Sequence, residues 1–410
     1  MIAIPDPAAS VVAVAIAYDV GWRSEPEGST GFAHLFEHLM FQGSEHLDKG
    51  EMPRLIQGNG GVFNGFTRPD TTVYFEQVPA GALELALYCE ADRMRSPRIT
   101  QENLANQIAV VKEEILVNVE NQPYGGFPWL DLPPVMFGTF ANAHNGYGSF
   151  EDLETASLEH ARHFFDAYYA PANAVLSIAG GVDPATALLL AERYFSGVPA
   201  RPAPARPSFA EPGRSGIAPV ERVDQLAPLP ALAVGYRVPD PIGDEDSYFA
   251  TVLLSALLTL GPASRLHERL VRHDRIAADV GAMWSGLDSP WGSRDPAFLA
   301  FIAHYPEHAL TERVVAAIDE ELERVAQGVA QEDVDAVLAQ VASAEWMELD
   351  TKYWLAVRAG VFAQQRTRPH LAFEIADRLS AAAPLVPEVA GRWFTPDLRA
   401  MVTLVPGTPP

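Results

Sequence analysis

The residues of this chain best suited to chemistry are two histidines and a glutamate within five positions. His34, Glu37 and His38 lie in a run of ten residues, 31–40, whose other members are mostly apolar. The apolar side chains recur at the spacing of a helix face. They are Phe32, Leu35, Phe36, Leu39 and Met40. On a helix, residues four apart project from one face, so both imidazoles could bind one zinc ion with Glu37 beside it.

A second interpretation of the two histidines is that they are core residues, each satisfied by a hydrogen bond. It fits less well, because three ionisable side chains on one short apolar helix are costly to bury without a partner. A metal ion supplies that partner, so we interpret these residues as part of a zinc site. Ser29 or Thr30 can cap the start of the helix. Glu25 and Glu27 lie just upstream.

A catalytic zinc ion needs a third protein ligand and an open position. Residues 101–121 predict a long helix, capped by Thr100, that carries Glu113 and Glu114. At ~100° per residue, Glu113 points nearly opposite the apolar face of this helix, whereas Glu114 lies at its border. This phase favours Glu114 as the third ligand. The preference is not absolute, because Val110 and Val117 make the back of the helix partly apolar too.

The elements around the histidine helix alternate between strands and helices. Residues 11–18 predict a buried strand, and residues 62–67 and 71–78 predict a hairpin. Residues 174–181 predict a further strand. Helices are predicted over residues 51–57, 82–94, 158–168 and 184–195. This alternation is typical of an α+β domain.

The second half of the chain repeats the pattern of the first at domain scale. The strand predicted over residues 231–236 corresponds to the strand that ends at Tyr18, and the helix predicted over residues 248–260 corresponds to the histidine helix. In this alignment Val252, Ser255 and Ala256 take the places of the zinc-site residues. The second copy therefore keeps the helix and lacks the ligands.

A proline-rich stretch separates the two halves. Its composition favours extended chain and not a helix or a central strand. The sequence therefore predicts a first domain over residues 1–197 with the zinc site, a linker over residues 198–216, and a second domain over residues 217–410 without zinc ligands.

Composition limits the possible classes of protein. A chain of 410 residues is long enough for two domains. Its net charge of −24 argues against binding to nucleic acid, because affinity for nucleic acid comes from clustered basic residues. Cys89 is the sole cysteine, so no internal disulfide framework is expected. No apolar run approaches the ~18 residues of a membrane span. The first residues lack the basic start of a signal peptide, and a cytoplasmic location is expected.

The motif His34-x-x-Glu37-His38 is the inverted zinc motif H-x-x-E-H of the inverzincins. The chain resembles the insulinase/pitrilysin family, M16, and in particular its short two-domain group, which is similar to the catalytic subunit of mitochondrial processing peptidase. In that family a glutamate about 76 residues beyond the second histidine completes the site, which is the separation of Glu114 from His38. Further segments fit the family over nearly the whole chain. They are residues 60–67, 90–94, 110–114, 121–125, 169–173 and 264–266.

The resemblance implies a fold and a chemistry. The fold would be α+β, with two structurally similar sandwich-like halves of the LuxS/MPP-like metallohydrolase type. One zinc ion per chain, on His34, His38 and Glu114, would lower the pKa of a bound water toward ~7. Glu37 would act as the general base for peptide hydrolysis.

The resemblance also implies how a peptide is held. Asn64, Gly65, Phe66 and Thr67 would pair with an extended substrate by β-augmentation. A competing interpretation of Asn64 is that of a turn residue that satisfies its own backbone.

Two departures from the family pattern qualify this interpretation. Gln107 stands where the family often has a glutamate that helps to hold the site, so the surroundings of the metal would be altered. Residues 296–306 match the stretch that in active members carries an arginine and a tyrosine facing the zinc, and here the stretch has Tyr305 and no arginine. Tyr305 alone is interpreted as a strand-end aromatic.

We expect a zinc metalloendopeptidase that cleaves unfolded peptides or presequence-like segments, cationic ones above all, inside a closed chamber. A homologous subunit would supply the arginine and the tyrosine, which makes this chain the catalytic subunit of a heterodimer. The alternative is a non-catalytic structural or peptide-binding subunit of the same family.

Overall fold

The computed structural model describes residues 1–213, 215–285 and 289–407. Its strands are β1 (Ile2–Pro5), β2 (Val11–Tyr18), β3 (Val62–Thr67), β4 (Thr72–Pro79), β5 (Ala174–Gly180), β6 (Val220–Asp224), β7 (Ala231–Arg237), β8 (Asp279–Trp284), β9 (Phe298–His304) and β10 (Ala400–Pro406). Its helices are α1 (Phe32–Leu39), α2 (Glu51–Gly58), α3 (Leu83–Arg95), α4 (Gln101–Ile115), α5 (Leu132–Met136), α6 (Phe140–Ala143), α7 (Phe150–Thr155), α8 (Leu158–Tyr168), α9 (Pro184–Phe195), α10 (Glu245–Thr259), α11 (Thr311–Gln327), α12 (Gln331–Asp350), α13 (Lys352–Arg366), α14 (Ile375–Ala382) and α15 (Val386–Trp393). The predicted linker and second domain include Arg214, residues 286–288 and residues 408–410, which lie outside the described residues.

The chain forms two compact units, each of which takes three separate segments. Unit 1 is Met1–Glu113, Gly146–Ser208 and Trp346–Phe373. Unit 2 is Glu114–Asn145, Phe209–Glu345 and Glu374–Pro410. The linear division into residues 1–197, 198–216 and 217–410 stays a prediction.

Unit 1 is built on a five-stranded sheet with the order β1-β5-β2-β4-β3. Only β1 and β5 are parallel; the other neighbours run antiparallel. The central strand β2 is an unbroken apolar run that is buried from Val12 to Tyr18. Such a run is typical of a strand covered on both faces of its sheet.

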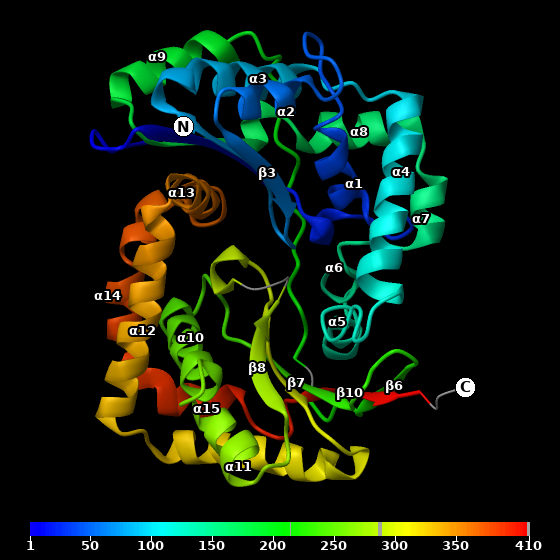
Figure 1. Ribbon diagram of the computed structural model, residues 1–410, viewed down its shortest axis with the longest axis vertical. Coiled ribbons are helices and arrows are strands. Elements are labelled where there is room, and N and C mark those ends of the chain that lie inside the picture. The colour runs from blue at the N-terminus through cyan, green and yellow to red at the C-terminus, as the bar shows by residue number, and fades with distance from the viewer. Residues whose placement is uncertain (214, 286–288, 408–410) are drawn as a thin grey trace. The chain divides into compact units, whose positions relative to one another are not determined.

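Helices cover both faces of this sheet (Figure 1). On one face, α3 and α9 pack against residues of β2 and β5 such as Val14 and Ile178. On the other face, α13 packs against alanines of β2 and against Phe75 of β4. The helix α13 comes from the last quarter of the chain, so residues far apart in sequence build one core.

Unit 2 repeats the topology of unit 1. Its sheet has the order β6-β10-β7-β9-β8, again with one parallel pair at one edge and antiparallel neighbours elsewhere. The apolar helix α10 follows β7 as α1 follows β2. The short helix α5 covers one face of the second sheet, where Leu132 and Met136 pack against Ala233 and Val402. The predicted duplication and the α+β class are therefore confirmed.

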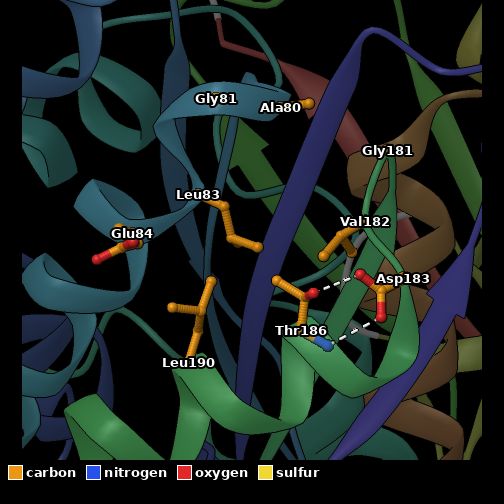
Figure 2. Close-up of a pocket in the computed structure, with 9 residues that line it drawn as sticks. All are labelled: Ala80, Gly81, Leu83, Glu84, Gly181, Val182, Asp183, Thr186 and Leu190. Atoms are coloured by element: carbon orange, nitrogen blue, oxygen red, sulfur yellow. Dashed lines mark hydrogen bonds between the residues drawn. The ribbon is translucent and has the colours of Figure 1, made fainter.

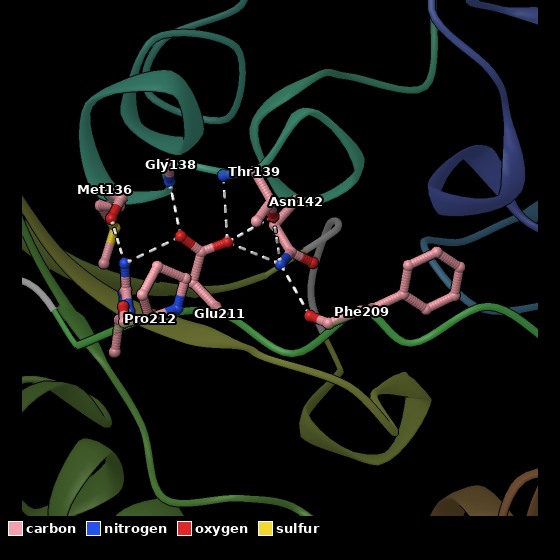
Figure 3. Close-up of polar contacts among 8 residues, drawn as sticks. Met136, Gly138, Thr139, Asn142, Phe209, Glu211 and Pro212 are labelled. Carbon is pink, nitrogen blue, oxygen red and sulfur yellow. Dashed lines mark hydrogen bonds and ion pairs between the residues drawn. The ribbon is translucent and has the colours of Figure 1, made fainter.

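The end of the predicted linker is fastened to unit 2 by Glu211. Its carboxylate accepts hydrogen bonds from the amides of Gly138 and Thr139, at 2.6 and 3.2 Å, and from Nδ2 of Asn142 at 2.8 Å (Figure 3). The same Asn142 nitrogen donates to the carbonyl of Phe209 at 2.9 Å. These polar contacts hold an extended segment without any helix or strand.

The helices and strands predicted in the first half are confirmed to within a few residues, although the long helix predicted over residues 101–121 ends as α4 at Ile115 and continues as a π-helix over Leu116–Glu120. Thr100 is confirmed as the cap of α4, because its hydroxyl accepts a hydrogen bond from the Asn103 amide at 3.2 Å. The strand β1 was not predicted, because four residues at a sheet edge carry too little pattern. Among the described residues, no helix combines the length and apolarity that crossing a membrane requires.

Candidate metal centre

The start of helix α1 differs from the prediction. Neither Ser29 nor Thr30 caps it, because the cap position is Gly31, whose φ of 84° lies in the left-handed region. The acceptor is the carboxylate of Glu25, which takes hydrogen bonds from the amides of Gly31 and Ala33 at 2.8 and 2.7 Å. A glutamate reaches both amides from outside the helix because its chain is longer than that of serine or threonine.

The two histidines of α1 converge. Nε2 of His34 and Nε2 of His38 lie 3.2 Å apart, and the two rings meet edge to face with centroids 4.8 Å apart. Burial, and then the neighbouring His38, lowers the pKa of His34 to about 3. A low pKa keeps this imidazole neutral, which is the form that binds a metal ion.

Glu114 joins the histidines. His34, His38 and Glu114 offer ligand atoms that all lie within 4.8 Å of one another. Glu114 lies on the same unbroken helix α4 as residues 101–113 of unit 1, so that helix fixes its position. Glu113 is exposed, whereas Glu114 is half-buried, as the helical phase predicted.

The geometry of this group suits zinc. Two nitrogen ligands at 2.0–2.1 Å from a tetrahedral ion lie about 3.3 Å apart. The observed 3.2 Å between the imidazole nitrogens agrees with that separation. Two imidazoles and one carboxylate are also the donor set of several catalytic zinc sites that keep a fourth position open.

The carboxylate of Glu37 has a defined partner on the neighbouring strand. The hydroxyl of Thr67, at the end of β3, donates a hydrogen bond to Glu37 Oε2 at 2.8 Å. Thr67 is buried, with 9% of its surface exposed. The side chain of Thr67 therefore orients Glu37, whereas the role of this residue in holding substrate stays a prediction.

The predicted substrate residues lie on an edge strand. In the sheet order of unit 1, β3 comes last, with β4 as its neighbour. Asn64 is exposed, and its side-chain oxygen accepts a hydrogen bond from the Gly65 amide at 2.9 Å. This is the self-satisfied arrangement that was the competing interpretation of Asn64. Phe66 packs toward Trp354 of α13, with ring centroids 6.3 Å apart.

Two further residues lie near the histidines or on the helix of Glu114. The ring of Tyr147 meets the ring of His34 edge to face at 5.2 Å, a neighbour that the sequence did not predict. Gln107 is buried on α4, two turns before Glu114, and its Nε2 donates to Asn106 at 2.8 Å. The predicted effect of Gln107 on the surroundings of the metal stays a prediction.

A second group of possible ligands, Glu45, His46 and Asp92, does not have metal geometry. Nδ1 of His46 lies 2.6 Å from Asp92 Oδ1, which is a hydrogen-bond distance and is shorter than the separation of two ligands on one ion. Ser44 and the His46 amide also donate to Asp92. Asp92 therefore holds the turn after α1 in place.

A buried ion cluster supports the strand and helix that frame the site. Arg93 pairs with Glu76, at 3.2 Å, and with Glu90, and all three side chains are buried. The guanidinium lies over the ring of Tyr74, whose hydroxyl donates to the Phe36 carbonyl of α1 at 3.4 Å. Burial, and then the Glu90 charge, raises the pKa of Glu76 well above its usual range.

A cavity of about 290 Å³ lies elsewhere in unit 1, where α3 and α9 begin (Figure 2). Its lining includes Leu83, Leu190 and Asp183 and none of the predicted site residues. Asp183 caps α9 by accepting from the amides of Ala185 and Thr186 at 3.1 and 3.0 Å. The cavity therefore lies at the capped start of α9 and outside the metal centre.

Comparison with protein families agrees with this architecture. Residues 1–124 match the insulinase family, peptidase family M16, and residues 155–341 match the M16 domain described as inactive. Together the two matches take in most of the chain. The chain belongs to the M16 family of peptidases. The match to the domain described as inactive includes helix α10, and the replacement of the zinc-site residues there by Val252, Ser255 and Ala256 stays a prediction.

Its relatives are bacterial proteins named as zinc proteases. Zinc protease PqqE of Helicobacter pylori is 28% identical over 277 residues, which cover 66% of this chain and 61% of that protein. An uncharacterized zinc protease of Rickettsia bellii is 25% identical over 352 residues, 82% of this chain and 78% of that protein. The chain thus spans about three fifths of the Helicobacter relative.

Solved structures share the fold. A protease from Helicobacter pylori has a TM-score of 0.88 at 24% identity. The match covers 98% of this chain and 96% of the Helicobacter chain. A putative M16-like peptidase from Alicyclobacillus acidocaldarius has a TM-score of 0.82 at 20% identity. The match covers 99% of this chain and 95% of the Alicyclobacillus chain. The two-unit M16 fold is therefore shown over nearly the whole chain.

Proposed function

We propose that this chain is a zinc metalloendopeptidase that hydrolyses unfolded peptides. The observation that carries the proposal is the convergence of His34, His38 and Glu114, with ligand atoms within 4.8 Å, beside a glutamate held by Thr67. Relatives named as zinc proteases support the metal and the reaction class. The proposal places one zinc ion on each chain.

When bound, the metal would act as a Lewis acid and would lower the pKa of a coordinated water toward ~7. His34, His38 and Glu114 would hold the ion, and a set of three protein ligands would leave room for that water. Glu37, adjacent to His38 in sequence and fixed by Thr67, is the proposed general base; it accepts the proton of the attacking water and passes it to the leaving amine. This role needs a carboxylate of fixed orientation, which the 2.8 Å hydrogen bond supplies.

The proposed substrate strand is β3. An extended peptide would add to its outer edge and form main-chain hydrogen bonds with residues 64–67. Asn64 is exposed and covers the Gly65 amide, so a peptide would displace this side chain on binding. Main-chain pairing favours unfolded segments, because a folded protein seldom offers a free strand.

The proposal also includes a partner. Residues 296–306, which include β9, contain no arginine. Tyr305 is buried and its hydroxyl lies 2.8 Å from the Thr311 hydroxyl, so it serves the core of unit 2. We propose that a homologous subunit supplies the missing arginine and tyrosine and closes a chamber around the peptide. The net charge of −24 favours cationic substrates.

The second candidate is a non-catalytic structural or peptide-binding subunit. The matched domain described as inactive favours it for the second half of the chain. The intact motif on α1 argues against it for the first half. A cytoplasmic location remains the prediction from sequence.

The test is cleavage of a quenched-fluorescent cationic peptide by the purified zinc-loaded chain, alone and with a homologous chain that lacks the histidine pair. Glu37→Gln is the inactive control at equal zinc content. We expect weak or no cleavage by the chain alone and strong cleavage by the pair. Full activity of the homogeneous chain would overturn the partner, and no cleavage in either preparation would favour the binding subunit.

A further inference from the structure

The start of α1 is held by a buried carboxylate. Glu25, 3% exposed, uses both oxygens: Oε2 accepts from the Gly31 amide at 2.8 Å and Oε1 from the Ala33 amide at 2.7 Å. Amides in the first turn of a helix have no partner within the helix. One rigid group that bonds two of them fixes the position of the first turn and its rotation about the helix axis.

A second carboxylate holds the residue before the helix. Asp152 of α7 accepts a hydrogen bond from the Thr30 amide at 3.0 Å and another from the Thr30 hydroxyl. That hydroxyl in turn accepts from the Ser149 amide at 3.1 Å. The segment that enters α1 is thereby tied to α7.

The two segments also meet backbone to backbone. A Cβ atom on Gly31 would come within 2.5 Å of the Tyr147 carbonyl oxygen, so this approach requires glycine. Close packing of this kind leaves the start of α1 little freedom to turn. The ring of Tyr147 then meets the ring of His34, one residue beyond Ala33.

The metal site depends on this rotation. An imidazole nitrogen lies several ångströms from the helix axis, so a turn of α1 by about 10° moves it by about 1 Å. Metal ligands tolerate only about 0.2 Å. Because His34 and His38 lie on the same helix, a turn of α1 moves both rings together and changes their distance from Glu114 on α4. The closeness of all three ligands therefore requires that the first turn of α1 be fixed from outside.

We propose that Glu25, supported by Asp152, is a positioning residue of the metal centre. It orients the helix on which His34 and His38 lie and touches neither the metal nor the substrate. This inference rests on the proposed zinc site.

The test compares Glu25→Gln with Asp183→Ala. Asp183 also caps a helix in unit 1 with two amides, but it lines the cavity of Figure 2 and not the site. Zinc affinity is measured by competition with a chelator, and Co²⁺ replaces zinc as a spectroscopic probe of ligand geometry. We expect Glu25→Gln to weaken zinc binding about 3- to 30-fold and to change the Co²⁺ absorption. Asp183→Ala should change neither, and Asp152→Asn should give a smaller change of the same kind.

Wild-type zinc affinity and an unchanged Co²⁺ spectrum in Glu25→Gln would overturn the inference, as would equal losses in Glu25→Gln and Asp183→Ala. If Glu25→Gln does not fold, Asp152→Asn decides by the same measurements. Absence of zinc binding by the wild-type chain would instead overturn the proposed function, so the two failures are distinguishable.

Discussion

Replacing Thr67 by valine tests the hydrogen bond on which the proposed general base depends. The Thr67 hydroxyl donates to Glu37 Oε2 at 2.8 Å from a side chain that is 9% exposed. Valine keeps the size and the β-branching of threonine but has no donor. The Glu37 carboxylate therefore loses a partner while the end of β3 keeps its packing.

The size of the effect follows from the type of hydrogen bond. A hydrogen bond to a charged group contributes about 1.5–3 kcal/mol. Glu37 is half-buried, so water replaces part of the lost interaction and the lower half of this range applies. A loss of about 1.5–2 kcal/mol corresponds to a fall of about 10- to 30-fold in kcat/KM. Because Thr67 orients the base, we expect most of this fall in kcat and little change in KM.

The assay is steady-state cleavage of a quenched-fluorescent peptide at matched zinc content, with the partner chain present. Thr67→Ser, which restores the hydroxyl, should recover most of the lost activity. Wild-type kcat in Thr67→Val would refute the reasoning. Equal losses in the valine and serine variants would show that restoring the hydroxyl is not sufficient, and would assign the effect to the packing at position 67 and not to the hydrogen bond.

Two further predictions concern stability. Burial raises the pKa of Glu76 above its ordinary 4.5. Above pH 4.5 the folded state therefore keeps a proton that the unfolded chain releases. The wild-type chain loses this stabilisation as the pH rises through the folded-state pKa. The free energy of unfolding of Glu76→Gln, measured with urea, should therefore rise relative to that of wild type between pH 5 and pH 8. A difference that does not change with pH would contradict this prediction. Gly360→Ala in α13 should raise the free energy of unfolding by about 0.5–1 kcal/mol, because helical glycine is costly. A Cβ there would meet Ser177 and Ala17 at ordinary distances of 3.5 and 3.8 Å, so a lower Tm would count against the packing described.

The spacing of residues along a helix was enough to predict which main residues of the site lie close together. The spacing of His34 and His38 on an apolar helix predicted that their rings share a face, and the structure has their Nε2 atoms 3.2 Å apart. The apolar face of α4 favoured Glu114 over Glu113, and Glu114 is the one beside the histidines. Local periodicity determines such features, because a helix has one geometry.

Contacts between separate segments were beyond the sequence. The Glu25 cap was missed because short-range capping rules favour Ser29 or Thr30, whereas the bond runs from a preceding loop back onto the helix. Nothing in the sequence of α13 indicated that this helix covers the sheet of unit 1. The Thr67 bond to Glu37 likewise depends on how β3 lies beside α1.

The central claim is that His34, His38 and Glu114 form one zinc site. Zinc titration by calorimetry tests it most directly, with Glu114→Ala compared with Glu113→Ala, its exposed neighbour on the same helix. The claim predicts one zinc ion per chain for wild type and Glu113→Ala, and affinity at least about 100-fold weaker for Glu114→Ala, because a ligand is lost. Equal zinc affinities in the two variants, or no zinc bound by wild type, would contradict it.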